Sequence, residues 1–350
     1  MNRLLTEVIA HKQIQRFAAP PTHRLAIGLI SNGERLEWAD SNIHANTSSS
    51  PFYEIGSITK TMTGLLLAVG EQKGFWSRSD SLSDLIPEWS SSPYAKQTTL
   101  QQLVTHTANL PRVPLNFKAT IADKKNPYAN YTEEHLAEAV LSEVPKTNRG
   151  HAYSNYGFGL LGWILSKRLG MSLHDAFQTM IFNPLGMTNT MLRSNNTHSP
   201  DMIPVFNAKG NPVPHWDFQD ATAGAGAVCS TLPDMLTYIE ANLSRADQPL
   251  GDALAVCHQE HYSIFQSRGI GVGYSWMFYK EKDGSTTHWH NGGTYGSSSF
   301  ATFNRDKGKG LVILSNYGTD IRSQIPLVGM GKLNVDKLAR TLTSKLYQKD

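Results

Sequence analysis

The hydrophobic positions of the chain follow a β-type pattern near both ends and a helical pattern between them. Near the N-terminus, the apolar run at 24–30 and the short run at 34–38 are separated by Ser-Asn-Gly at 31–33. An Asn-Gly pair between two such runs is typical of a β-hairpin. Beyond residue 222, turn residues separate four more runs that favour strands, at 271–279, 286–290, 298–304 and 310–315.

The helical pattern is clearest from Ser57 to Lys73, where apolar residues recur at helical spacing until Gly74 ends the pattern. The polar stretch at 39–54 predicts a long loop before this helix. The other helical segments are mostly short, and loops rich in Pro and Asn join many of them. We expect them at 1–12, 100–106, 132–143, 156–169, 173–181, 231–244 and 333–347.

Strands at both ends of the chain with helices between them predict an α/β fold, in which an antiparallel β-sheet is flanked by helices and interrupted by an inserted all-helical domain. We assign residues 1–75 and 222–350 to a discontinuous α/β domain and residues 76–221 to the helical domain. The cleft between two such domains is the default place for a binding site.

The composition is that of a folded globular protein. Of the 350 residues, 40% are hydrophobic and 17% are charged, which excludes a disordered chain. Lys and Arg number 32 and Asp and Glu 29, so the net charge is +3; with no basic run standing out, we expect no nucleic-acid partner. Cys229 and Cys257 are too few for a disulfide scaffold, and we expect reduced, packed thiols, with one bridge as the alternative.

The start of the chain does not have the pattern of a signal peptide, because Glu7 interrupts its apolar stretch. The longest apolar run, from Phe158 to Leu165, is too short to span a membrane. We therefore expect no membrane span and a location either in the cytoplasm or outside it after removal of a signal. The sequence does not indicate an oligomeric state.

The sharpest chemical signal is the segment Glu54-Ile-Gly-Ser57-Ile-Thr-Lys60. Ser57 and Lys60 are three positions apart, so on a helix they share a face. A Ser hydroxyl needs an adjacent base to become a nucleophile, and a Lys that is partly buried near other cations can lose its proton and serve as that base. Backbone N–H groups near the helix start can stabilise an oxyanion. The alternative is a Ser at a helix cap followed by a surface Lys.

The segment Tyr153-Ser154-Asn155 is a second signal. In an extended or loop backbone, residues two positions apart point the same way, so Tyr153 and Asn155 are expected to face one cleft. A Tyr beside a Lys can act as a base and then as an acid to the leaving group. The alternative is a packed loop tyrosine before a turn.

A third signal, His-Trp-His-Asn-Gly-Gly at 288–293, ends an expected strand. A polar or cationic side chain there can bind a substrate carboxylate, and the glycines let a substrate backbone lie along the strand edge. The alternative is a β-turn with incidental histidines. Asn126 and Tyr128 are further candidates for substrate contact, and for these two residues a turn is again the alternative.

In order and spacing, these three segments resemble the motifs of the penicillin-recognising serine hydrolases. The chain is similar to the class C β-lactamase branch and its relatives, the D-Ala-D-Ala carboxypeptidases, D-aminopeptidases and family VIII esterases. The resemblance extends from about residue 24 to 316. Other stretches in the style of the family are 103–111, 183–187, 223–227 and 230–234.

The resemblance implies a role for each matching residue. Ser57 would be the acylated nucleophile, Lys60 and Tyr153 would share the base and acid work, and Asn155 would bind the substrate's amide side chain and help to hold Lys60. The backbone N–H groups of Ser57 and Gly293 would form the oxyanion hole. The resemblance also implies an α/β domain with an antiparallel sheet and an all-helical domain, with the site between them. The remaining substrate-binding residues would be His290, Asn291 and Gly292.

The third motif departs from the family pattern, because class C β-lactamases carry Lys-Thr-Gly where this chain has His290-Asn291-Gly292. A His is only partly charged at neutral pH. We therefore expect a weaker hold on a substrate carboxylate that tightens at acid pH. The loss of the Lys argues against efficient β-lactam hydrolysis and leaves acyl-enzyme formation intact.

The predicted function is that of a serine hydrolase that acts through an acyl-enzyme, without metal or organic cofactor, on a small β-lactam, D-Ala peptide or ester. A carboxylesterase or D-amino-acid peptidase of the same family is an alternative. A penicillin-binding sensor without turnover is another, and it would give a single burst. A zinc hydrolase built on His288 and His290 lacks the usual further ligand context. No G-x-S-x-G or dinucleotide loop is present.

Overall fold

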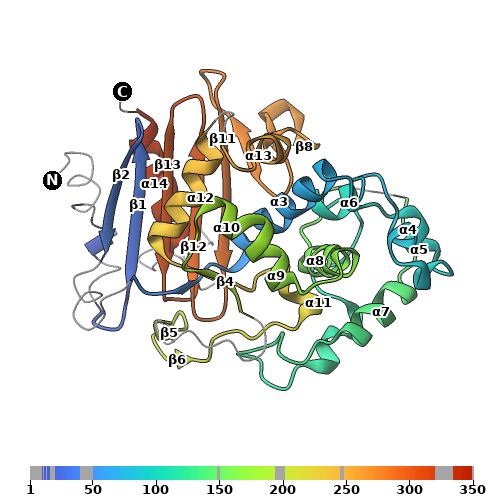
Figure 1. Cartoon of the computed structure of the whole chain (residues 1–350). Coiled ribbons are helices and arrows are strands. Elements are labelled where there is room, and N and C mark those ends of the chain that lie inside the picture. The colour runs from blue at the N-terminus through green and yellow to red at the C-terminus, as the bar shows by residue number, and fades with distance from the viewer. Residues whose placement is uncertain are drawn as a thin grey trace.

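The computed structural model describes residues 10, 12, 14–15, 20–39, 50–147, 150–193, 202–244, 248–319 and 334–348. Its main sheet is antiparallel and takes strands from both ends of the chain (Figure 1). The strands are β1 (Leu25–Ser31), β2 (Glu34–Ala39), β8 (Tyr262–Phe265), β9 (Ile270–Val272), β10 (Met277–Lys280), β11 (Thr286–Gly293), β12 (Ser298–Asn304) and β13 (Lys309–Ser315). Their order is β2-β1-β13-β12-β11-β10-β9-β8.

The hairpin predicted at the N-terminus is confirmed. Ser31 pairs with Glu34, and Asn32 and Gly33 between them both have positive φ, at 53° and 80°. Two such residues make the tight turn whose twist matches that of the flanking strands. β1 also pairs with β13, with Leu25 opposite Ser315, so the expected joining of the two chain ends in one sheet is confirmed as well.

Two helices cover opposite faces of this sheet. Alternate residues of β1, namely Leu25, Ile27 and Leu29, pack with α14 (Val335–Gln348). Ala26 and Ile30 point the other way, into the larger core that contains α12 (Leu232–Leu243). Because both faces are buried, the strand is apolar throughout rather than alternating. Gly28 permits the close approach of α12, since a Cβ there would lie 2.7 Å from a methyl carbon of Leu236.

Most of the remaining helices, several of which are only a single turn, lie on the side of the molecule away from β1 and β2 (Figure 1). They pack around α3, which follows Ser57, and α8, which follows Ser154. The two are α3 (Thr59–Gln72) and α8 (Asn155–Leu169), and the others are α4 (Leu82–Leu85), α5 (Pro93–Gln97), α6 (Leu100–Val104), α7 (Glu133–Ser142), α9 (Leu173–Phe177), α10 (Asn183–Leu185), α11 (Asp220–Ala223) and α13 (Gly251–His258).

Short elements complete the fold. A small sheet has the order β3-β7-β4 and places the chain just before Ser57. The other strands and the helical turns are β3 (Tyr53–Glu54), β4 (Thr190–Leu192), β5 (Val205–Phe206), β6 (Pro212–Val213), β7 (Val228–Ser230), η1 (Gly56–Ile58), η2 (Pro87–Trp89), η3 (Leu115–Thr120), η4 (Gln178–Phe182) and η5 (Gln266–Arg268).

Some sequence-based expectations need correction. The strand expected at 271–279 is two strands, β9 and β10, because a tight turn in which Gly273 N donates to Trp276 O at 2.9 Å separates them. β8 and α13 were not predicted. The helix expected at 1–12 and most of the loop at 39–54 lie outside the described residues. Cys229 and Cys257 are both buried and unpaired, as expected. Within the described ranges, no helix combines the length and apolar character needed to cross a membrane.

Candidate active site

Ser57 lies in η1, at the junction between β3 and α3. The strand before it is fixed by the small sheet, where Ile55 N donates to Val228 O at 3.1 Å. Gly56 then adopts φ +51°, and a Cβ on this residue would lie 2.5 Å from Gly293 N. A glycine is therefore required for Ser57 to lie against the end of β11. The Ser57 side chain is half-buried and faces a cavity.

Lys60 lies one helical turn after Ser57 and is fully buried. Its Nζ atom is 3.0 Å from Ser57 Oγ and donates to Ala225 O at 2.6 Å. Burial lowers the pKa of Lys60 well below its ordinary value, and the positive charge of Arg112 lowers it further. Among the described residues, no carboxylate forms an ion pair with Lys60. The amine therefore has the environment of a neutral base.

Tyr153 shares the space around Lys60. Its ring centroid lies 5.0 Å from Lys60 Nζ and 5.4 Å from Arg112 Cζ. Burial raises the pKa of Tyr153 to about 12, against the lowering effects of its hydrogen bond with Ser57 and of the charge on Arg112. The phenol is therefore protonated near neutral pH and is placed next to the Ser57 hydroxyl.

A buried histidine, His106, holds the segment that carries Tyr153. Its ring packs at 4.5 Å on the Tyr153 ring, measured between centroids. Ser154 N donates to His106 Nδ1 at 3.1 Å, and Ala152 N donates to His106 O at 2.8 Å. Burial lowers the pKa of His106 well below its ordinary value, and Lys60 lowers it further when protonated, so the ring accepts the Ser154 hydrogen bond in its neutral form.

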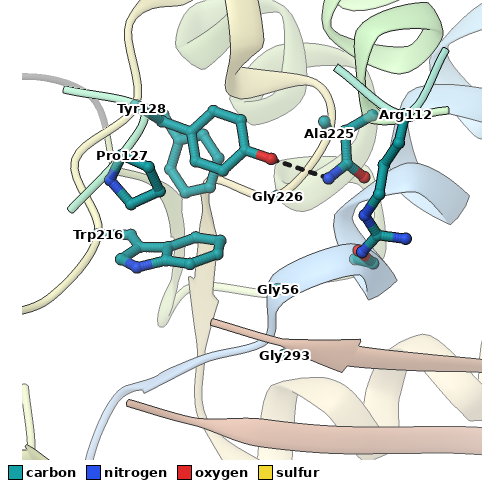
Figure 2. A pocket seen from close by; sticks show the side chains of 11 residues that line it. Gly56, Arg112, Pro127, Tyr128, Trp216, Ala225, Gly226 and Gly293 are labelled. Atoms are coloured by element: carbon teal, nitrogen blue, oxygen red, sulfur yellow. Dashed lines mark hydrogen bonds between the residues drawn. The ribbon is translucent and has the colours of Figure 1, made fainter. Parts of the chain in front are cut away.

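Asn155 is the first residue of α8, and its side chain lines the same cavity as Ser57. Its Nδ2 atom donates to the Tyr128 hydroxyl at 2.8 Å (Figure 2). The expected contact of Asn155 with Lys60 is not formed among the described residues, since Lys60 bonds to Ser57 and to Ala225 O. Asn155 Oδ1 is buried without a partner, so it remains available to accept a hydrogen bond.

The third motif lies on β11, where side chains alternate between the two faces of the sheet. His290 is 2% exposed, and its ring centroid lies 6.4 Å from that of Tyr153. Asn291 points to the opposite face, where its Nδ2 donates to Asp336 Oδ1 at 3.1 Å. A Cβ on Gly292 would lie 2.0 Å from Ile55 O, so this glycine lets β11 approach the segment before Ser57. Only the Gly293 end of this motif lines the cavity.

Burial determines the charge of the His290 side chain by shifting its pKa. Burial is the main cause that lowers the pKa of His290 to about 3; Lys60 lowers it further when protonated, and the hydrogen-bond contact of Nδ1 with Asn291 O at 2.7 Å opposes the shift. A group with this pKa is neutral from pH 5 to 8. The sequence-based expectation of a partly charged His290 at neutral pH therefore does not hold in this structure.

The cavity beside Ser57 has a volume of about 150 Å³. Figure 2 shows Arg112 on one side and Pro127, Tyr128 and Trp216 on the other. Sequence reasoning proposed Tyr128 but missed Arg112, Trp216 and Phe218. Asn126 does not line the cavity, and its Nδ2 donates to Asp217 Oδ2 at 2.7 Å.

A buried carboxylate, Glu54, fixes the surroundings of the cavity. Its Oε1 accepts a hydrogen bond from Trp216 N at 2.7 Å, and its Oε2 accepts from Thr294 Oγ1 at 2.7 Å and Ser297 Oγ at 2.8 Å. Arg193 Nη1 lies 3.6 Å from Oε1. Although burial alone raises the pKa of Glu54, hydrogen bonds and the interaction with His215 lower it overall.

The histidines of the zinc alternative are engaged with backbone oxygens. His288 Nε2 lies 3.1 Å from His258 O, and His290 Nδ1 contacts Asn291 O. In the part of the chain that the structure describes, no three His, Cys, Asp or Glu side chains form a group that could hold a metal ion.

The chain is similar in sequence to β-lactamases and to a penicillin-binding protein. The model of the β-lactamase family matches residues 19–326. Penicillin-binding protein 4* of Bacillus subtilis (strain 168) is 26% identical over 287 residues, which cover 78% of this chain and 62% of that protein. A β-lactamase of Pseudomonas fluorescens is 24% identical over 329 residues, which cover 83% of this chain and 88% of that protein. The chain thus spans about three fifths of the length of the first relative.

The fold has close counterparts among solved structures. The structure of a β-lactamase/D-alanine carboxypeptidase from Pseudomonas syringae superposes with a TM-score of 0.79 at 20% identity, covering 98% of this chain and 99% of that one. The predicted fold class, an antiparallel sheet flanked by helices as in class C β-lactamases and DD-peptidases, is therefore confirmed.

Proposed function

The chain belongs to the β-lactamase family of serine hydrolases. From this premise we propose that Ser57 is its nucleophile and that the enzyme cleaves amide or ester bonds through an acyl-enzyme. The observation that carries the proposal is the 3.0 Å separation of Lys60 Nζ from Ser57 Oγ, together with the depressed pKa of the buried Lys60. A neutral amine keeps a lone pair that can take the hydroxyl proton.

In acylation, Ser57 Oγ attacks the carbonyl carbon while its proton passes to Lys60 Nζ. The negative charge that develops on the carbonyl oxygen is stabilised by the backbone N–H groups of Ser57 and Gly293, the two segments brought together at Gly56. When the bond to the leaving group breaks, the protonated Tyr153 donates its proton to that group. The proton held by Lys60 then restores Tyr153.

In deacylation, a water molecule attacks the acyl carbon and the same groups work in reverse. Lys60 Nζ takes the proton of the attacking water and then passes it to Ser57 Oγ, 3.0 Å away, as the acid product leaves. Asn155, whose Oδ1 has no partner, accepts a hydrogen bond from an amide N–H of the acyl group. The active site would thus need only side chains and backbone amides of this chain.

For the substrate, we propose a β-lactam or a D-Ala-type peptide, in line with the family. A second candidate, ester or D-amino-acid peptide hydrolysis, is favoured by one observation. The neutral His290 stands where class C β-lactamases have a cationic Lys, so a carboxylate on the leaving-group side would be bound less strongly.

Intact-mass spectrometry after mixing with a penicillin tests the nucleophile. We expect one adduct per chain, mapped to Ser57, which is lost in Ser57→Ala and kept in the exposed control Ser79→Ala. An adduct on Ser57→Ala, or unchanged turnover by that variant, would overturn the proposal. Parallel assays with a chromogenic cephalosporin and a short-chain nitrophenyl ester separate the substrate classes, and a single burst without turnover would indicate a sensor.

A further inference from the structure

Arg112 is the only charged residue among the described residues that line the cavity beside Ser57. Its backbone is held at the start of α8, because Arg112 O accepts hydrogen bonds from Asn155 N at 2.9 Å and Tyr156 N at 3.1 Å. Its side chain is exposed, with the guanidinium over the ring of Tyr153. Figure 2 shows it across the cavity from Tyr128 and Trp216.

Among the described residues, no carboxylate forms an ion pair with Arg112, whereas Arg193 is paired with Glu54 and Asp217. Lys60 and His290 are buried and do not line the cavity, and burial lowers the pKa of both. Among the described residues, Arg112 is therefore the charged side chain that an anionic group entering the cavity would meet.

The other walls of the cavity suit an uncharged hydrocarbon chain of a ligand that ends in an anionic group. Tyr128 stacks on Phe218 with ring centroids 4.9 Å apart, and Trp216 lies 5.2 Å from Tyr128. These rings offer an apolar wall for methylene groups, while the unpartnered Asn155 Oδ1 can accept from an amide. His290 and Tyr153, which would contact the leaving group in the proposed mechanism, do not line this cavity, so we assign it to the acyl side of Ser57.

We propose that Arg112 selects substrates whose acyl portion ends in a carboxylate, as in a dicarboxylic acid joined through one of its carboxyl groups to the scissile bond. The guanidinium binds the distal carboxylate through two parallel hydrogen bonds, which suits the fork geometry of Arg. This inference rests on the proposed function, since it names the substrate class of the same site.

Two penicillins that differ only in the end of the acyl chain test the inference. One carries a hexanamido side chain, and the other carries an adipamido side chain, in which a carboxylate replaces the terminal methyl group. The second-order rate of Ser57 acylation is followed by intact mass. We expect the adipamido compound to react about tenfold faster, because one hydrogen-bonded charge pair is enough to raise the rate by about a factor of ten.

Variants assign this preference to Arg112. In Arg112→Gln the ratio of the two rates should fall to about one, and Arg112→Lys should retain part of it, because Lys keeps the charge without the fork. The matched control Arg268→Gln removes an exposed Arg far from the cavity and should keep the full ratio. Raising the salt concentration should reduce the ratio in the native protein.

The outcomes separate the inference from the proposed function. Equal acylation of Ser57 by both penicillins in the native protein would overturn the inference and leave the proposed function standing. A preference that survives Arg112→Gln would also overturn it. If neither compound acylates Ser57 and the nitrophenyl ester is not turned over, both the proposed function and the inference fail.

Discussion

Glu54 Oε1 accepts a hydrogen bond from the backbone amide of Trp216 at 2.7 Å, across 162 residues of sequence. The other oxygen of the same carboxylate is bonded to the turn after β11 through Thr294. One buried side chain thus holds the segment before Ser57, a wall of the cavity and the end of the β11 strand at fixed distances. Its loss should disturb all three together.

We predict that Glu54→Gln destabilises the protein by about 3 kcal/mol, because an amide cannot accept all the hydrogen bonds that the carboxylate accepts, and the buried Arg193 keeps only Asp217 as a charged partner. Urea unfolding would measure this change. The exposed Glu34→Gln serves as a control and should change the free energy of unfolding by less than about 0.5 kcal/mol. A Glu54→Gln protein as stable as the native one would show that the carboxylate charge is not needed.

The same carboxylate predicts a loss of stability in acid. Hydrogen bonds and the nearby His215 lower the pKa of Glu54 in the folded protein below its ordinary value of 4.5. The unfolded chain therefore binds this proton first, so the contribution is fully present above pH 4.5 and is lost as the pH falls through the folded pKa. Unfolding curves between pH 3 and 6 should fall less steeply for Glu54→Gln than for the native protein. Parallel curves would contradict this prediction.

Removal of the base is expected to abolish efficient acylation. Lys60→Met fills similar space without an amine, and we predict that it slows acylation of Ser57 by about 100- to 10,000-fold, the usual contribution of a general base. Because burial lowers the pKa of Lys60 well below 10.5, the native rate should level off well below pH 10.5. Stopped-flow acylation from pH 5 to 11 would test this. A rate that rises up to pH 10.5 would identify Lys60 as a cation in the resting protein.

The role of Tyr153 depends on the leaving group. Its pKa of about 12 keeps the phenol protonated, so it acts first as a proton donor. We predict that Tyr153→Phe slows cleavage of an amide by about 100-fold but slows cleavage of a nitrophenyl ester much less, because nitrophenolate leaves without a proton. Parallel kcat measurements on the two substrates would show the difference. Equal losses on both would point to a positioning role instead.

Local patterns predicted most of the sheet and helices correctly, because each is encoded within a few consecutive residues. The Asn32-Gly33 turn and the helix after Ser57 are examples. The boundary between β9 and β10 was missed because Ser275, at the turn, has a positive φ of 70° that its residue type does not signal.

The candidate site could be predicted only where its residues occur in short motifs. Ser57, Lys60 and Tyr153 are brought together by the fold. Arg112 and Trp216 gave no sequence signal, and Glu54 was named only as the first residue of the Ser57 segment, because the importance of all three depends on contacts between segments far apart in the chain. Asn291 shows the opposite case. It belongs to a motif, but strand alternation turns its side chain to the other face of the sheet, toward Asp336.

His290 is the residue for which the structure changes the expected pH dependence most. If it were partly charged near neutral pH, the KM for an anionic substrate would rise between pH 5 and 8 as His290 lost its proton. Burial lowers its pKa to about 3, so it is already neutral throughout that range. We therefore predict that the contribution of His290 to KM is constant from pH 5 to 8. The ratio of KM between His290→Gln and the native protein, measured at several pH values, isolates this contribution from the titration of other groups. A ratio that changes by more than about threefold across the range would mean that His290 is protonated when substrate binds.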